Sequence, residues 1–354
     1  MLNTIDPAEA GLNSAQQTKA PAIAIVGATG AVGVELLRCI EARGMATSKV
    51  RLLASARSAG RTMMLNGETL TVETLGDDSF DGIDIALFSA GSGISKRYAE
   101  IAVKAGAVVI DNSSAFRMDE AVPLVVPEVN PSALDAHAGV IANPNCVAAI
   151  ATIALAPLHR AQAIRRLTIA TYQAASGAGA AAVEELREST AAYLRGETYA
   201  PRVLPHPYAF NLFSHNAEMD AESGHNGEEM KVIAETRKIL GMPELNIGIT
   251  CIRVPVLRTH GMAISVEFDE PMLPEHARDL LGAAPGLRVV DDPERNYYPM
   301  PSDATGQDDV LVGRIRRDLG DPTGRTLALF VVGDQLLKGA ALNAVQIAER
   351  LLQR

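Results

Sequence analysis

A short apolar run followed by a glycine-rich turn constrains this chain more than any other feature. Residues 22–26 read AIAIV, residues 27–33 read GATGAVG, and residues 35–40 resume apolar positions at helical spacing. Strand, glycine turn and helix in this order are the context of a dinucleotide site, because glycines let the backbone approach a pyrophosphate at a helix N-terminus. The spacing is G-x-x-G-x-x-G rather than G-x-G-x-x-G, so a merely tight strand-to-helix turn stays an alternative.

The second predicted strand, residues 49–54 (KVRLLA), bears on the choice of cofactor. NAD-specific folds place an acid at the end of this strand for the ribose 2′-hydroxyl, whereas this chain has Ser55, Arg57 and Ser58 there. A 2′-phosphate needs positive charge and hydrogen-bond donors, which an arginine with hydroxyls supplies. The sequence therefore favours NADP over NAD, with an exposed loop position for Arg57 as the alternative.

Two further apolar runs extend the pattern, at residues 83–88 (IDIALF) and 107–110 (AVVI), with a helix predicted between them at about residues 95–104. This alternation of strand and helix predicts an α/β domain with a parallel, doubly wound sheet. The loops after these strands fall at the carboxyl ends, where such sheets bind ligands. Arg117 follows the second of these loops and alone would be interpreted as a surface charge.

A cysteine at a predicted helix start is the first candidate for chemistry. Cys146 precedes an Ala-rich apolar segment that runs to Pro157 and predicts a helix. A thiol at a helix N-terminus lies among free backbone N–H groups, so we expect a lowered pKa and a nucleophilic thiolate. The alternative for an isolated cysteine is a small buried apolar residue.

The second half of the chain predicts a mixed sheet with helices and two long loops. Its elements are expected at residues 167–173 (strand), 180–194 (helix), 201–216 and 223–227 (loops), 228–240 (helix), 250–256, 261–268 and 327–332 (strands), and 339–352 (helix). The last helix is expected to pack back on the first domain.

Composition excludes several classes of protein. The formal net charge of −10 argues against a nucleic-acid partner, and no apolar run approaches the roughly 20 residues that span a bilayer. The three cysteines are widely spaced, so they predict neither a disulfide framework nor a metal site, and they favour a reducing, cytoplasmic compartment. Residues 1–20 lack the pattern of a secretory signal and are predicted to form a disordered tail.

Seven sequence blocks carry a resemblance to a known family. They are residues 26–33 (VGATGAVG), 54–60 (ASARSAG), 126–130 (VPEVN), 143–146 (NPNC), 172–179 (YQAASGAG), 252–256 (IRVPV) and 333–336 (GDQL). In this order the chain resembles the aspartate-β-semialdehyde dehydrogenases, from about residue 22 to its C-terminus. The resemblance implies a Rossmann-like NADP-binding domain of residues 21–146 plus the C-terminal helix 336–354, and a mixed-sheet catalytic and dimerisation domain of residues 147–335.

The resemblance also implies roles for individual side chains. Cys146 would attack the acyl carbon of aspartyl phosphate and form a thioester, which NADPH reduces to the aldehyde. His260 would be the acid/base, a role that needs a group titrating near neutral pH. Gln173 would orient the substrate, Arg253 would bind its α-carboxylate and Glu228 its α-ammonium.

The resemblance assigns two further sets of residues. The phosphate-binding residues would be Arg117, Lys231 and Asn145. The cofactor-binding residues would be Gly27, Thr29, Gly30, Ala31, Val32, Ser55, Arg57, Ser58, Ser176, Gly177 and Gln335. The implied partners are small molecules and a second copy of the chain in a homodimer, with a tetramer as the alternative. The implied pathway is the biosynthesis of lysine, threonine, methionine and diaminopimelate.

The sequence departs from the family at two places. Family members commonly carry hydroxyl residues directly after the nucleophile, where this chain has residues 147–149 (VAA), and a serine after the histidine, where Gly261 stands. We expect these departures to affect rate rather than reaction class. Glu229 is an alternative to Glu228, because the preceding loop varies in length.

Two other functions compete with this interpretation. N-acetyl-γ-glutamyl-phosphate reductase performs the same reduction on a longer substrate, but an acetylated amine has no charge to pair with Glu228. Asn145, where that relative tends to carry Gly, also favours the aspartyl substrate. A catalytically silent paralogue would keep the fold as a binding or structural protein, and the retention of Cys146, Gln173, Arg253 and His260 argues against it.

Overall fold

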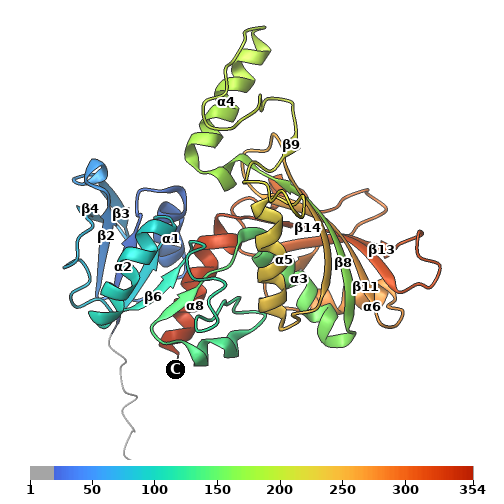
Figure 1. Ribbon diagram of the computed structural model, residues 1–354, viewed down its shortest axis with the longest axis horizontal. Coiled ribbons are helices and arrows are strands. Elements are labelled where there is room, and N and C mark those ends of the chain that lie inside the picture. Colours follow the sequence, from blue (N-terminus) through green and yellow to red (C-terminus); the bar gives the residue numbers. More distant parts are fainter. Residues whose placement is uncertain (1–19, 354) are drawn as a thin grey trace, which may run out of the picture.

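Two seven-stranded sheets lie side by side in the computed structural model, which describes residues 20–353 (Figure 1). The first sheet has the order β3-β4-β2-β1-β5-β6-β7 and is parallel except for β3. Its strands are β1 (Ala22–Val26), β2 (Lys49–Ala54), β3 (Thr62–Leu65), β4 (Glu68–Thr74), β5 (Ile85–Phe88), β6 (Val108–Asp111) and β7 (Val140–Ala142). All five side chains of β1 are buried, as expected for a central parallel strand.

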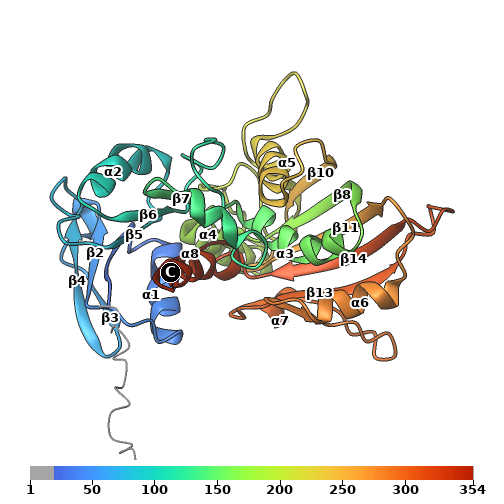
Figure 2. The same ribbon diagram turned by 90° about the horizontal axis from the view of Figure 1, so that it is seen from below.

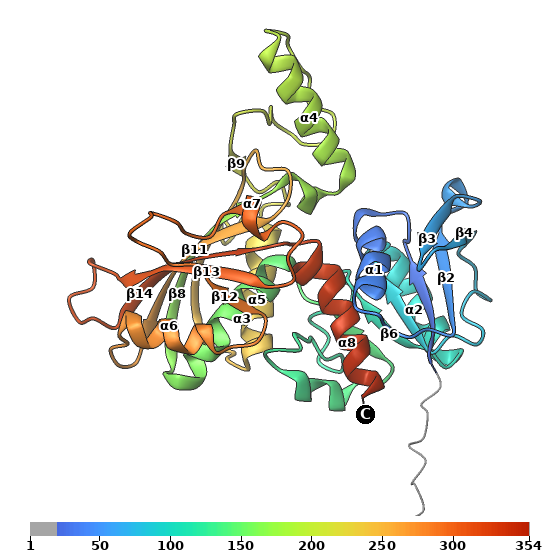
Figure 3. The same ribbon diagram turned by 180° about the vertical axis from the view of Figure 1, so that it is seen from behind.

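Helices cover both faces of the first sheet. Helix α1 (Ala31–Ala42) packs on one face together with the C-terminal helix α8 (Leu342–Leu352), and α2 (Ser92–Lys104) packs on the other. Figures 2 and 3 show α8 between the two sheets, beside α1. Two short 3-10 helices, η1 (Ala56–Ser58) and η2 (Pro131–Ala136), lie in the connections. The predicted doubly wound α/β architecture is confirmed.

The second sheet is mixed, with the order β12-β13-β14-β11-β8-β10-β9. Its strands are β8 (Ile164–Gln173), β9 (Phe213–Ser214), β10 (Asn246–Arg253), β11 (His260–Phe268), β12 (Leu287–Val289), β13 (Val310–Arg317) and β14 (Thr326–Gly333). Helices α3 (Cys146–Ala161), α5 (Gly227–Leu240) and α6 (Pro274–Gly282) cover one face and form the largest core with it. On the opposite face, the short helix α7 (Pro301–Ala304) packs on β14, and Val290 packs in the same small cluster.

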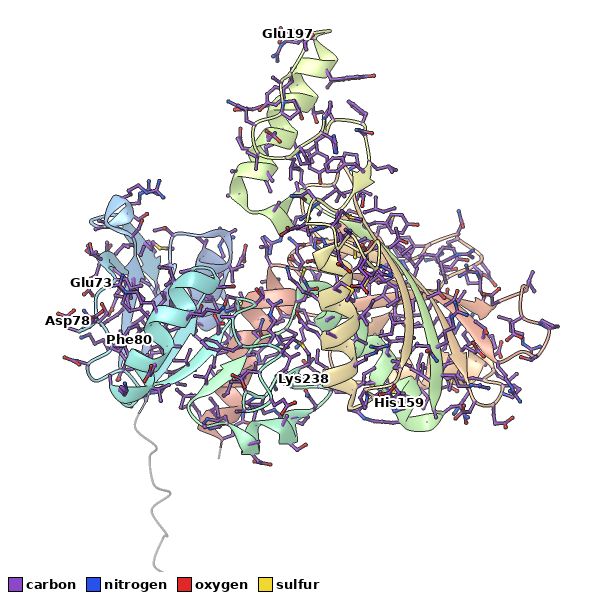
Figure 4. All side chains as sticks on the ribbon, viewed as in Figure 1. Glu73, Asp78, Phe80, His159, Glu197 and Lys238 are labelled. Atoms are coloured by element: carbon purple, nitrogen blue, oxygen red, sulfur yellow. The ribbon has the colours of Figure 1, made fainter. Side chains whose placement is uncertain are left out.

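Helix α4 (Ala180–Leu194) follows the 3-10 helix η3 (Ala175–Ala178) and projects away from both sheets (Figure 1). Figure 4 places Glu197 at the tip of this arm. Its base packs around Leu186, Leu204 and Tyr208, whereas Tyr193 and Leu194 near the tip are exposed.

Several elements differ from the sequence prediction. Helix α3 continues past Pro157 to Ala161, so this proline does not end the helix. The predicted C-terminal helix is divided into a π-helix, η4 (Leu337–Ala341), and α8. Six strands, β3, β4, β7, β9, β12 and β13, and the helices α6 and α7 were not predicted. The predicted domain boundary after residue 146 stays a prediction, and residues 1–19 of the predicted tail lie outside the described residues.

No helix between residues 20 and 353 combines the length and the apolar character needed to cross a membrane.

Candidate active site

A cavity of about 310 Å³ brings the predicted catalytic residues together from both halves of the chain. It is lined by Val32, Asn112, Ser114, Arg117, Pro144, Asn145, Cys146, Gln173, Ser176, Gly177, His215, Glu228, Lys231, Arg253, His260, Gln335, Leu336, Gly339 and Ala340. Every residue predicted for catalysis, substrate binding or phosphate binding is among them. Of the predicted cofactor residues, this cavity contains Val32, Ser176, Gly177 and Gln335.

Cys146 is the first residue of helix α3, as the sequence predicts. The side chain of Asn145 caps this helix, because its Oδ1 accepts hydrogen bonds from the N–H groups of Val147 at 2.9 Å and Ala148 at 3.4 Å. Gly339 packs directly on the nucleophile: a Cβ added there would lie 2.7 Å from the Cys146 Cβ. The thiol is therefore held between a capped helix start and the π-helix.

The expectation of a lowered thiol pKa is wrong for the ligand-free site. Burial raises the pKa of Cys146 to about 12, and the Glu228 carboxylate adds to the rise, while Arg253 and Arg117 act in the opposite direction. The helix N-terminus is outweighed because the thiol lies within the cavity, partly buried, and faces an anion. Cys146 is thus a neutral thiol at neutral pH.

His260 is fully buried at the start of β11. Its Nδ1 accepts a hydrogen bond from the Ala174 N–H at 3.0 Å, so the neutral ring carries its proton on Nε2. Among the described residues, Nε2 has no hydrogen-bond partner. Burial, with Arg253 and His215 nearby, holds the pKa of His260 well below its usual value, so the ring is neutral and presents an N–H group.

Glu228, rather than Glu229, faces the cavity. Its Oε1 accepts hydrogen bonds from the Asn145 Nδ2 at 2.9 Å and from the Gln173 Nε2 at 3.1 Å. Burial raises the pKa of Glu228, but the Asn145 amide, the Lys231 charge and the Gln173 amide outweigh that effect, and the pKa lies below its usual value. The Glu229 carboxylate instead accepts from the backbone N–H groups of Asn226 and Cys251. Glu228 therefore offers a carboxylate to a cationic ligand group.

Arg253 is almost fully buried at the end of β10. Its Nη1 donates to the Ala174 carbonyl at 3.1 Å, and its Nη2 contacts His215 Nε2 at 2.7 Å. Burial, followed by the Arg253 charge, lowers the pKa of His215 to about 4, so this imidazole is neutral. These contacts hold the guanidinium in place, and no carboxylate between residues 20 and 353 pairs with it.

The two predicted phosphate cations differ in their surroundings. Arg117 donates to the Asn143 carbonyl at 2.9 Å, to the Asn112 carbonyl at 2.7 Å and to Glu235 Oε1 at 3.1 Å. Lys231 is exposed and makes no hydrogen bond or ion pair within residues 20–353. Arg117 is a fixed charge and Lys231 an adaptable one.

A second cavity, of about 450 Å³, lies over the glycine turn and the end of β2. It is lined by Val26, Gly27, Thr29, Gly30, Ala54, Ser55, Ala56, Thr74, Leu75, Ser89, Ala90, Ile94, Arg97 and Tyr98. Gly27 has φ +87°, and a Cβ there would lie 2.7 Å from the Ser89 carbonyl oxygen, so only glycine fits. Such a turn at the start of α1 fits the phosphates of a dinucleotide.

Three predicted cofactor residues line neither cavity. Ala31 is the first residue of α1, and Ser58 accepts a hydrogen bond from the Thr29 hydroxyl at 3.2 Å. Arg57 is exposed on η1, beside the cavity residues Ser55 and Ala56.

Sequence reasoning missed two site residues. His215 belongs to the predicted loop 201–216, and the length of that loop was the one signal of a function there. Glu235 accepts the Asn145 N–H at 2.5 Å in addition to its bond with Arg117, and burial raises its pKa. Glu235 lies seven residues after Glu228, so the helix predicted at 228–240 places both carboxylates on one face, and this spacing is the signal that could have predicted Glu235.

Comparison with known proteins agrees with this arrangement. Residues 22–137 match the family model "Semialdehyde dehydrogenase, NAD binding domain", and residues 155–338 match "Semialdehyde dehydrogenase, dimerisation domain". Aspartate-semialdehyde dehydrogenase from Synechocystis sp. is 52% identical over 332 residues, which cover 94% of this chain and 97% of that protein. The chain belongs to the aspartate-semialdehyde dehydrogenase family.

Other members of the aspartate-semialdehyde dehydrogenase family support the assignment. The Bacillus subtilis enzyme is 46% identical over 337 residues, 93% of this chain and 96% of that protein. The crystal structure of aspartate semialdehyde dehydrogenase II complexed with ASA from Vibrio cholerae has a TM-score of 0.91 at 40% identity and covers 95% of this chain and 99% of that one. The chain therefore matches these enzymes over nearly their whole length.

The two departures from the aspartate-semialdehyde dehydrogenase pattern lie away from the cavity lining. Val147 and Ala148 are fully buried in the core of the second sheet, and Gly261 does not line the cavity. A Cβ at Gly261 would point to the Phe330 ring, at 3.0 Å from Cζ. A side chain at position 261 would therefore be directed toward Phe330.

Proposed function

We propose that the chain catalyses the reversible, NADPH-dependent conversion of L-4-aspartyl phosphate to L-aspartate 4-semialdehyde and phosphate. One observation carries this proposal: Cys146, His260, Arg253 and Glu228 line a single cavity that also reaches Val32 on the cofactor-binding helix. Arg253 can bind the α-carboxylate of the substrate and Glu228 its α-ammonium, while Arg117 and Lys231 take the phosphate.

The acylation step needs no additional base. Cys146 Sγ bonds to the acyl carbon, the carbon–oxygen bond to phosphate breaks, and the thiol proton leaves with the phosphate oxygen as hydrogen phosphate. This assignment of the proton follows from His260, whose neutral ring offers an N–H group and not a lone pair. The Nε2–H group instead stabilises the negative charge that develops on the acyl oxygen.

The reduction step returns the thiol. When bound, NADPH supplies a hydride to the acyl carbon of the thioester. His260 Nε2–H holds the resulting oxyanion by a hydrogen bond, and Gln173, which donates to Glu228 at 3.1 Å, keeps the substrate end in place. The oxyanion then re-forms the carbon–oxygen double bond, the carbon–sulfur bond breaks to give the aldehyde, and the Cys146 thiolate released takes up a proton from solvent. In this mechanism His260 donates a hydrogen bond, and it does not act as the base that the resemblance implies.

We infer NADP rather than NAD as the cofactor and the cytoplasm as the compartment. Support for NADP is the group of Ser55, Arg57 and Ser58 at the end of β2, where no acid stands. Support for a reducing compartment is that Cys39, Cys146 and Cys251 are all free. The matched dimerisation domain supports a homodimer, which we place at the second sheet.

An activity assay tests the proposal. With aspartate semialdehyde, phosphate and NADP, we expect NADPH formation that depends on phosphate. Cys146→Ala should abolish turnover while NADPH fluorescence still reports binding. An inactive wild-type protein, or one active only with the N-acetylglutamate analogue, would contradict the proposal. An active Cys146→Ala variant would place the nucleophile elsewhere.

A further inference from the structure

Arg258 joins the cofactor-binding helix to the strand of the active-site histidine. Its Nη1 donates to Glu35 Oε1 at 2.8 Å, and its Nε donates to Asp334 Oδ2 at 2.7 Å. Glu35 belongs to α1, which begins at the glycine turn, and Asp334 directly follows β14. Arg258 itself lies two residues before His260, the first residue of β11. One guanidinium therefore connects the two halves of the molecule beside the site.

Both carboxylates of this bridge are buried. The side chain of Asp334 is fully buried, and that of Glu35 is 8% exposed. Loss of Arg258 leaves the buried Asp334 carboxylate without its cation and leaves Glu35 with Arg38 of α1, so α1 and the Asp334 segment would be expected to move apart. The Asp334 segment also reaches the nucleophile, because its carbonyl accepts the N–H of Gly339, which packs on Cys146.

The residue between Arg258 and His260 is strained. Thr259 has φ +84°, a conformation that a β-branched residue rarely adopts. Its N–H donates to Gln335 Oε1 at 2.7 Å, and its hydroxyl contacts the Thr305 hydroxyl at 2.8 Å. The direction in which the His260 side chain leaves the backbone depends on the conformation of Thr259. The contacts with Gln335 and Thr305 stabilise this conformation.

We propose that Arg258 is a positioning residue that couples the placement of α1, and thus of the bound nucleotide, to the orientation of His260. Arg258 does not line the cavity of Cys146; it lines a separate cavity with Glu35 and Arg38. It acts through the Thr259 backbone and Asp334. The effect on turnover rests on the proposed function, whereas the effect on His260 does not.

Arg38 provides a matched control. It donates to the same Glu35 oxygen at 3.0 Å, but it lies on α1 itself and its side chain is 65% exposed. In Arg258→Met we expect kcat to fall on the order of 10- to 100-fold, as for a small displacement of a reacting group, with the KM for aldehyde and phosphate little changed. Arg38→Met should keep the wild-type kcat, and Arg258→Lys, which cannot fork to both carboxylates, should be intermediate.

The strained residue offers a rescue experiment. Glycine adopts a φ near +84° without strain, so Thr259→Gly in the Arg258→Met background should recover part of the lost kcat. Glu35→Gln weakens the bridge from the other domain and should also lower kcat, and it tests the proposal if Arg258→Met does not fold. A kcat for Arg258→Met and Glu35→Gln equal to that of Arg38→Met would overturn the proposal.

A second readout is independent of activity. In protein labelled at histidine, the His260 ring resonances should shift when NADP is added to the wild type, and this shift should be lost in Arg258→Met and kept in Arg38→Met. An unchanged shift in Arg258→Met would overturn the coupling. Failure of the proposed function would appear separately, as an inactive wild-type enzyme whose His260 signal still responds to NADP.

Discussion

Cys146 is a neutral thiol whose environment, not its helix position, decides its reactivity. Because burial and the Glu228 carboxylate raise its pKa to about 12, alkylation of Cys146 by iodoacetamide in the ligand-free protein should rise with pH, roughly 10-fold per unit, without levelling off up to pH 10. Glu228→Gln removes an anion, lowers the thiol pKa and should speed alkylation at pH 8.

Mass spectrometry of the Cys146 peptide measures this rate apart from Cys39 and Cys251. Glu229→Gln is the control, because the Glu229 carboxylate bonds backbone N–H groups away from the cavity. A plateau near neutral pH, or equal rates in the two variants, would contradict the assigned thiol pKa.

Arg57 provides a residue-scale test of the cofactor. It is exposed beside the nucleotide cavity, where it can reach a 2′-phosphate. Arg57→Ala should weaken NADP binding by roughly 1.5–3 kcal/mol, as for one charge-assisted hydrogen bond, and leave NAD binding nearly unchanged. Titration of both nucleotides by fluorescence measures the difference, with Arg61→Ala as the control. Equal losses for both nucleotides would make Arg57 a bystander.

At the residue scale, sequence reasoning found the chemistry but not the contacts between charged groups. Cys146 and Gln173 could be named because motifs mark them, and His260 because the resemblance matches it to the family's acid/base. The raised pKa of Cys146 could not, since it depends first on burial in the folded chain and then on an acid 82 positions along the sequence. His215 beside Arg253 was equally hidden, because a loop of irregular backbone has no period to place its side chains.

Helix α5 carries Glu228 into the site and depends on its first turn. Asn226 accepts hydrogen bonds from the N–H groups of Glu228 and Glu229, and Glu229 bonds back to the Asn226 N–H, a complete capping box. Asn226→Ala should lower the free energy of unfolding by about 1 kcal/mol and raise the KM for aspartate semialdehyde, because the start of the helix loosens.

Denaturant unfolding and steady-state kinetics measure the two effects of the cap. Asn226→Ser keeps a capping oxygen and should behave nearly as the wild type. A KM unchanged in Asn226→Ala would show that Glu228 is held by Asn145 and Gln173 alone.

At the element scale, long segments with a regular apolar pattern were predictable, whereas strands at the edges of the sheets were not. The strands β1 and β5 and the helices α2 and α5 follow directly from apolar patterns. Strand β3 has a largely exposed pattern, since it is the outermost strand of its sheet, and so gave no apolar signal. The π-helix η4 was predicted as an ordinary helix, because only tertiary contact with Cys146 reveals its irregular turn.

At the scale of the whole molecule, the less covered face of the second sheet is the expected dimer surface. Strand register sets Thr250, Ala170, Ala263 and Phe330 in one row across β10, β8, β11 and β14, each partly or fully exposed. Ala263→Arg places a charge in this row and should convert a dimer to a monomer in sedimentation velocity. Thr71→Arg, exposed on β4, is the control. A dimeric Ala263→Arg variant would move the interface elsewhere.

The position of α8 has a consequence for folding during synthesis. Its residues Leu342, Val345 and Ile347 share a buried core with Ile23 and Leu36, so the core of the first sheet is completed by a segment that is made after the second sheet. The second sheet is complete once β14 has emerged, at Gly333. Ribosomes add about 5–20 residues per second, so the apolar face that α8 covers stays exposed while the second sheet is made. We expect chaperones to protect this face.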